Sequence, residues 1–168
     1  ERLYINKNNT SIFKFQPVKN FNSPNLKIYT FNAGFKKDKD DLLFIVFNSP
    51  VPVSAIYSKT STPSAPIIWD KKNNKGLCKI LIVNSGNANA HTGIKGVNVI
   101  KMYTKYAAKK FSCRVDQILV SSTGVIGEQL DENKIIDKIK FIKESNQKDF
   151  LSAARAIMTT DTYPKTVI

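Results

Sequence analysis

The sequence predicts a single α/β domain in which helices pack on a β-sheet. Three observations support this prediction. Hydrophobic residues make up 42% of the chain, which is enough for a core. Runs of β-branched residues alternate with segments whose apolar residues recur at helical spacing. No linker or internal repeat divides the chain, so residues 1–168 are expected to form one domain.

The first part of the chain is predicted to hold one buried strand. Residues 1–30 are polar and contain Pro17 and Pro24, so this N-terminal segment is expected to be irregular. The apolar run over 41–47 predicts a buried strand. The Asn-Ser-Pro-Val-Pro stretch over 48–52 is expected to end that strand.

The middle of the chain is predicted to contain the central strand of the sheet. Residues 53–57 are a short strand candidate, and a Ser/Thr/Pro-rich loop follows over 58–64. The charged stretch over 70–76 predicts a solvated turn. The continuous β-branched run over 77–83 is typical of a central strand, and it leads into a segment rich in Gly and Asn over 84–96.

Three helices and one more strand are predicted in the rest of the chain. The strand covers 115–121, and Asp131 is a suitable N-cap for the second helix. The last helix is expected to start near Asp149 and to end before Pro164. The apolar faces of the three helices are Val99, Ile100, Tyr103, Tyr106, Ala107 and Phe111; Ile135, Ile136, Ile139 and Ile142; and Phe150, Ala153, Ala154, Ile157 and Met158.

The chain is strongly basic, with 26 Lys and Arg residues against 13 Asp and Glu and a formal net charge of +13. Only three of the basic residues are Arg, and the Lys residues are spread along the whole chain. Sequence-specific nucleic-acid binding favours Arg, whose planar guanidinium matches phosphate and guanine edges. We interpret the charge as a solvated surface, with attraction of an anionic partner as the alternative.

Metal and membrane functions find little support. Cys78, Cys113 and His91 are the chain's only Cys and His residues, which are too few and too scattered for a convincing zinc site. Both cysteines are expected to be small buried side chains in a reducing compartment. The apolar runs are too short to span a membrane, and the first residues do not resemble a secretory signal.

Two segments that follow predicted strands are candidates for a site. Asn84–Gly96 could point backbone N–H groups at an anion, or it could be a tight connection without a ligand. Its Asn side chains can cross-link the loop backbone and make it rigid. In Ser121–Glu128, the Thr123 hydroxyl and the Gly124 N–H could be the two donors of an oxyanion hole. Thr123 could instead be a helix N-cap or a nucleophile, although no base stands beside it in sequence.

A third candidate is Thr159–Thr162, at the end of the last predicted helix. Its three hydroxyls and one carboxylate could bind an amino-acid substrate. The alternative is a frayed helix end whose side chains form only local hydrogen bonds.

These motifs stand in a fixed order: VNSGNANA-x-TG over 83–93, STGVIGE over 122–128 and AIMTTDT over 156–162. In this combination the chain resembles the N-terminal, α-chain part of the ornithine acetyltransferase family, also called glutamate N-acetyltransferases. The resemblance covers roughly residues 31–165.

The resemblance implies an α-β-β-α sandwich of sheets packed between helices, incomplete without a second chain. Family members are precursors that cut themselves before a Thr, which becomes the N-terminal nucleophile of the β chain. The acetyl group moves from N2-acetylornithine through this Thr to glutamate, in arginine biosynthesis, and acetyl-CoA is a further possible co-substrate. The α and β chains form an α2β2 heterotetramer, which we expect to be cytoplasmic.

Residue by residue, the resemblance assigns Thr123 and Gly124 to the oxyanion hole. Thr160 best matches a substrate-binding Thr, with Thr162 as the rival. The presence of a single His is then no objection, because the free amine of an N-terminal Thr can act as base for its own hydroxyl.

Two features depart from the family. His91 stands where the family usually has Cys, at a position with no expected catalytic role. The chain ends at Ile168, before the family's self-cleaving Thr, so we expect a trimmed α chain or a fragment that is inactive alone. The alternative functions are a related N-terminal-nucleophile aminopeptidase and a non-catalytic basic binding protein.

Overall fold

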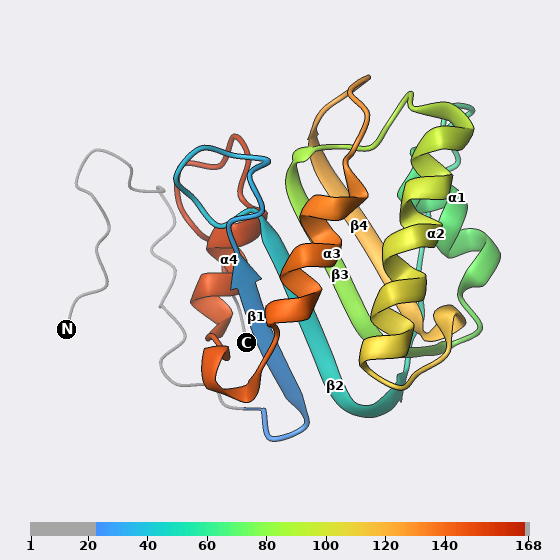
Figure 1. Cartoon of the computed structure of the whole chain (residues 1–168). Coiled ribbons are helices and arrows are strands. Elements are labelled where there is room, and N and C mark those ends of the chain that lie inside the picture. Colours follow the sequence, from blue (N-terminus) through green and yellow to red (C-terminus); the bar gives the residue numbers. More distant parts are fainter. Residues whose placement is uncertain (1–22, 167–168) are drawn as a thin grey trace.

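A computed structural model describes residues 23–166, which form one mixed four-stranded sheet (Figure 1). The strands are β1 (Leu26–Phe31), β2 (Leu42–Pro52), β3 (Leu77–Asn87) and β4 (Ile118–Val125), in that order across the sheet. β1 and β3 both pair antiparallel with β2, and β4 pairs parallel with β3. The predicted α/β class is confirmed, and the described residues contribute a single sheet to it.

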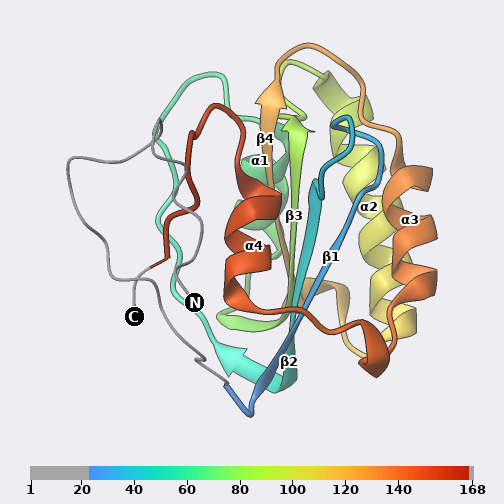
Figure 2. The same cartoon turned by 90° about the vertical axis from the view of Figure 1, so that its left-hand side faces the viewer.

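The helices lie on both sides of this sheet (Figure 2). The helices are α1 (Ala65–Asn73), α2 (Gly93–Lys110), α3 (Glu132–Phe141) and α4 (Phe150–Ile157), with 3₁₀ turns at Val115–Gln117 and Glu144–Asn146. The first three pack in one cluster with the sheet, whereas α4 packs with β1 and β2 on the opposite face. None of the described helices is long and apolar enough to cross a bilayer.

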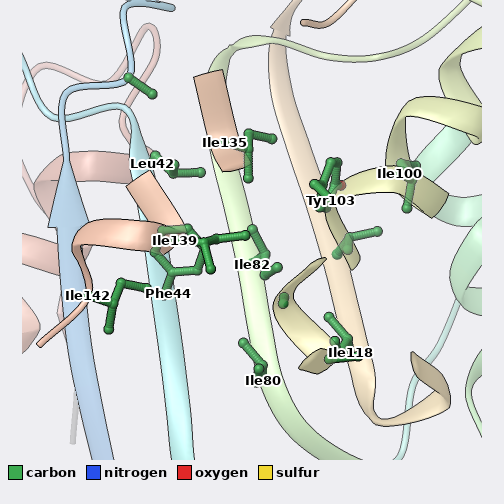
Figure 3. Packing of buried hydrophobic residues seen from close by; sticks show 14 of the residues in the cluster. Leu42, Phe44, Ile80, Ile82, Ile100, Tyr103, Ile118, Ile135, Ile139 and Ile142 are labelled. Atoms are coloured by element: carbon green, nitrogen blue, oxygen red, sulfur yellow. The ribbon is translucent and has the colours of Figure 1, made fainter. Parts of the chain in front are cut away.

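The core follows from alternation along the strands. Ile80 and Ile82 of β3 are fully buried and belong to the cluster with α1, α2 and α3, together with Phe44 and Ile139 (Figure 3). The next residue, Val83, points to the opposite face and packs with the α4 cluster. This face contains Ile28, Leu43, Ala153 and Ala156 as its buried members.

The predicted helices are confirmed, and their caps explain where they start. The Asp131 carboxylate accepts a hydrogen bond from the Asn133 N–H at 2.9 Å, and the Asp149 carboxylate accepts one from the Ser152 N–H at 2.7 Å. α4 ends at Ile157, several residues before Pro164. The predicted central strand is also confirmed, because β3 lies between β2 and β4.

Three predictions about the strands are wrong. Part of the segment expected to be irregular over 1–30 forms β1, whose pairing with β2 the local composition did not reveal; residues 1–22 lie outside the described residues. β2 does not stop where the Asn-Ser-Pro-Val-Pro stretch begins but runs through this stretch to Pro52. Pro50 is tolerated because the ladder with β3 is interrupted between Val46 and Val51, so no backbone donor is needed there. Residues 53–57 form no strand.

The prediction of a solvated turn over 70–76 is also wrong for the first half of this stretch. That half belongs to α1, and its Asp70 is buried. The Asp70 carboxylate accepts the Val120 N–H of β4 at 3.1 and 3.3 Å, so α1 is tied to this strand, which lies at the edge of the sheet. Burial raises the pKa of Asp70 to about 7, against the opposing effect of the Val120 hydrogen bond.

The cysteine prediction is confirmed for Cys78, which is buried, whereas Cys113 is only half-buried; both thiols are free. Burial raises the pKa of Cys78 to about 11, so the unreactive protonated thiol dominates at neutral pH.

Asp70 makes stability depend on pH. Its folded pKa of about 7 lies above the value of 3.8 for an unperturbed Asp, so between these values the folded state binds more protons than the unfolded state. Stability therefore falls as pH rises from about 4 to about 7, by at most about 4 kcal/mol. Asp70→Asn keeps an oxygen acceptor for the Val120 N–H and removes this loss. We expect the free energy of unfolding, measured in urea, to decrease from pH 4.5 to pH 8 by more in the wild type than in Asp70→Asn.

Asp38→Asn is the matched control, because Asp38 is exposed. Its pH dependence should equal that of the wild type. Equal pH dependence in the wild type and Asp70→Asn would contradict a raised pKa of Asp70 as the cause of the loss of stability.

Candidate functional site

The candidate site lies at one end of the sheet, where β3 and β4 finish side by side. Their parallel register places Ser85 opposite Thr123 and Gly86 opposite Gly124. The loop between β1 and β2 and the carboxyl end of α4 lie at the same end of the sheet (Figure 2). The fold therefore brings the Asn84–Gly96 and Ser121–Glu128 segments together.

Three stretches of backbone touch at this end. A Cβ on Gly124 would lie 2.3 Å from the Gly86 carbonyl carbon and 2.6 Å from the Asn87 nitrogen. A Cβ on Gly86 would in turn lie 2.7 Å from the Phe35 carbonyl oxygen. Both glycines also have positive φ, +135° for Gly124 and +100° for Gly86. No side chain fits between these backbones, which explains why glycine occupies both positions.

Asn side chains cross-link the backbone of this segment, as the sequence predicted, and they also join it to β4. The Asn84 amide donates to the Asn87 carbonyl at 2.8 Å and accepts from the Ser122 hydroxyl at 2.6 Å, which joins β3 to β4. The Asn87 amide donates to the Glu128 carbonyl at 3.1 Å. The loop that follows β4 is thereby held against the end of β3.

Asn89 fixes the connection to α2. It is fully buried, its amide donates to the Gly96 carbonyl at 3.1 Å, and its side-chain oxygen accepts the Thr92 hydroxyl at 2.8 Å. Its own backbone carbonyl accepts the Ala65 N–H at the start of α1, at 3.0 Å. The Asn84–Gly96 segment is therefore rigid because its backbone polar groups are paired inside the protein.

A buried carboxylate organises the loop between β1 and β2. Asp41 has no exposed surface, and its oxygens accept the backbone N–H groups of Ala33 at 2.7 Å, Phe35 at 2.6 Å and Lys36 at 2.8 Å. The Asp41 carbonyl accepts the Ser85 N–H at 2.8 Å. Asp41 thus holds the Phe35 backbone against Gly86.

Two side chains from this region bind the carboxyl end of α4. The Ser85 hydroxyl donates to the Ala156 carbonyl at 2.5 Å. The Lys36 ammonium donates to the Ala156 carbonyl at 3.2 Å and to the Met158 carbonyl at 2.8 Å. Burial lowers the pKa of Lys36, although the charge of Asp41 opposes this shift.

The four residues predicted from sequence differ in exposure. Thr123 is half-buried, and alternation along β4 places it on the face of the sheet that carries α4. Gly124 is exposed at the end of the strand. Thr160 and Thr162 are exposed in the turn that follows α4.

Thr123 is not a helix N-cap, because it lies within β4 and α3 begins only at Glu132. Within the described residues no hydrogen bond occupies the Thr123 hydroxyl, which leaves it available as a donor. His91 is exposed with φ of +56°, a conformation that suits a turn. Over residues 23–166 no group of three or more His, Cys, Asp or Glu side chains is arranged to hold a metal ion.

Comparison with known proteins gives a consistent result. The model of the ArgJ family matches residues 27–168.

The chain belongs to the ArgJ family.

Two relatives are proteins named arginine biosynthesis bifunctional protein ArgJ. Those of Agrobacterium fabrum and Brucella suis are 41% and 42% identical to this chain over 143 residues, which is 83% of the chain. The matched region is 35% of each relative, so the chain spans about a third of the length of these curated relatives.

Solved structures of the family share the fold. A crystal structure of ArgJ from Bacillus halodurans superposes with a TM-score of 0.74 at 30% identity, covering 83% of this chain and 74% of that one. An ornithine acetyltransferase from Mycobacterium tuberculosis, crystallised with ornithine, also gives 0.74, at 26% identity over 84% and 79% of the two chains. The similarity to the ornithine acetyltransferase family seen in the motifs is therefore confirmed.

Sequence reasoning missed the residues that support the site. The sequence pattern predicts Asp41 only as the first residue of a strand and predicts no role for Phe35 or Lys36. The signal in the sequence is that Asp41 begins an apolar run that is predicted to be buried. A buried carboxylate needs hydrogen-bond partners, so this position indicates a polar contact with a neighbouring loop.

Gly124→Ala tests the close approach of the strands. The added Cβ would overlap the Gly86 and Asn87 backbones, so the ends of β3 and β4 must separate. We expect a loss of unfolding free energy of at least about 1–3 kcal/mol in urea denaturation, in the range of overpacked positions. Gly127→Ala is the control, because Gly127 also has positive φ (+89°) but nothing lies within 4 Å of its Cβ position. Equal losses for the two variants would mean that backbone strain alone accounts for the effect.

Proposed function

We propose that this chain is the α-chain portion of a glutamate N-acetyltransferase of arginine biosynthesis. In this proposal an acetyl group moves from N2-acetylornithine to glutamate through a Thr at the N-terminus of a β chain. The proposal is supported above all by the meeting of Thr123 and Gly124 with the Gly86 backbone at the end of a rigid, cross-linked pair of strands. Membership of the ArgJ family gives the expected reaction.

The chemistry needs two donors that do not move. Attack of the Thr hydroxyl on the acetyl carbonyl gives a tetrahedral intermediate with a negative oxygen. In our proposal the Thr123 hydroxyl and the Gly124 N–H donate to that oxygen, because donors held in place before the reaction cost little reorganisation. The intermediate then expels the amine of ornithine, and glutamate removes the acetyl group by the reverse sequence.

The remaining parts of the proposal concern substrate and assembly. Thr160, or Thr162 as its rival, would bind polar groups of the amino-acid substrate from the exposed turn after α4. The β chain of the same precursor would supply the nucleophile, in an α2β2 heterotetramer in the cytoplasm. We propose no resident cofactor; acetyl-CoA, where an enzyme of this kind uses it, is a co-substrate.

The direct test uses the complete precursor from which the chain derives, expressed and allowed to cleave itself. We expect transfer of isotope-labelled acetyl from N2-acetylornithine to glutamate, measured by mass spectrometry. No transfer by a fully cleaved enzyme would contradict the proposal. Hydrolysis of aminoacyl amides in place of transfer would favour the related aminopeptidase.

Thr123→Ala in the same enzyme separates transition-state stabilisation from binding. Loss of one oxyanion donor should lower kcat by about 10²–10³-fold and change KM little. Ser121→Ala is the matched control, because Ser121 lies two residues earlier on the same face of β4 and is exposed. An unchanged kcat in Thr123→Ala would remove Thr123 from this role.

A further inference from the structure

The end of α4 is held by a lysine whose function the acetyl-transfer chemistry does not explain. The last carbonyls of a helix have no partners within the helix. Here the half-buried Lys36 ammonium donates to the Ala156 carbonyl in the last turn of α4 at 3.2 Å, and to the carbonyl of Met158, the residue that follows α4, at 2.8 Å. A positive charge at this position also complements the helix dipole.

Lys36 is itself fixed at its other end. Its backbone N–H donates to the buried Asp41 carboxylate at 2.8 Å, beside the Phe35 N–H, which donates to the same oxygen at 2.6 Å. The Ser85 hydroxyl provides a second tie to the Ala156 carbonyl, at 2.5 Å. The end of α4 is therefore attached to the loop and the strand that support Gly86.

The distance along the chain from this tie to the candidate substrate turn is short. Met158 is one of the carbonyls that Lys36 binds, and Thr160 follows two residues later. On the other side, the Phe35 carbonyl oxygen lies only 2.7 Å from the position that a Cβ on Gly86 would take, and Gly86 lies against Gly124. A single dipeptide, Phe35-Lys36, thus contacts both the strand ends and the base of the Thr159–Thr162 turn.

We propose that Lys36 is a positioning residue that fixes the Thr159–Thr162 turn relative to the Thr123–Gly124 pair, so that Thr160 meets the amino-acid part of the substrate. This inference rests on the function proposed above. Lys36 acts through Thr160 and is assigned no contact with the substrate. Loss of Lys36 should therefore weaken substrate binding, while the acetyl-transfer step stays nearly intact.

The test replaces Lys36 with Met in the complete, self-cleaved enzyme. We expect the KM for N2-acetylornithine to rise about tenfold, the effect of one lost hydrogen bond to a charged group, with kcat within about threefold of the wild type. Lys36→Arg retains charge and donors and should restore most of the affinity. Lys37→Met is the matched control, because the neighbouring Lys37 is exposed. Its KM should equal that of the wild type.

A double-mutant cycle distinguishes positioning from a general structural effect. If Lys36 acts through Thr160, the change in KM caused by Lys36→Met should largely disappear in a Thr160→Ala background. Additive effects of the two substitutions would overturn the inference, as would a KM in Lys36→Met equal to that of Lys37→Met. If Lys36→Met fails to fold or to cleave, Lys36→Gln, which keeps one donor, is used in the same cycle.

The two proposals fail in different ways. Absence of acetyl transfer by the wild-type enzyme counts against the proposed function. Normal transfer by the wild type together with an unchanged KM in Lys36→Met counts against the role of Lys36 alone.

Discussion

The Asp41 carboxylate is the interaction on which this end of the molecule depends. A carboxylate with no exposed surface is unfavourable unless its oxygens accept hydrogen bonds. Here three residues of one loop, Ala33, Phe35 and Lys36, donate their backbone N–H groups to it. The loop must fold around Asp41 for this to occur. Once folded, it presents the Phe35 carbonyl to Gly86 and the Lys36 side chain to α4. One buried charge thereby sets the positions of two neighbouring elements.

The strand ends beside this loop meet at two glycines. Gly86 and Gly124 let the backbones of β3 and β4 approach more closely than residues with a Cβ permit. Among the side chains there, those of Asn84, Asn87 and Ser122 form hydrogen bonds with the backbone and with each other. Rigidity and close approach are the properties that preorganised hydrogen-bond donors require.

Sequence reasoning succeeded where local pattern decides the structure. The β-branched run over 77–83 and the helix capped by Asp131 carry their signal within a few residues, and both were predicted. The Asn84–Gly96 and Ser121–Glu128 segments were both predicted as candidates because each follows a strand, whereas their meeting results from the parallel pairing of β3 with β4. By contrast, β1 forms only because β2 pairs with it, and Asp70 is buried only because Val120 offers an N–H across the fold. The roles of Asp41 and Lys36 likewise depend on partners that no local window contains.

The contact between Lys36 and α4 also sets an order of events during protein synthesis. Lys36 and the Ala156 carbonyl it binds are separated by 120 positions, and Ser85 and the same carbonyl by 71. The ribosome makes β1, β2 and their loop long before it makes α4, so Lys36 cannot form its bonds to the end of α4 until then. The nascent chain can therefore form this tie only after the residues up to Met158 have left the ribosome.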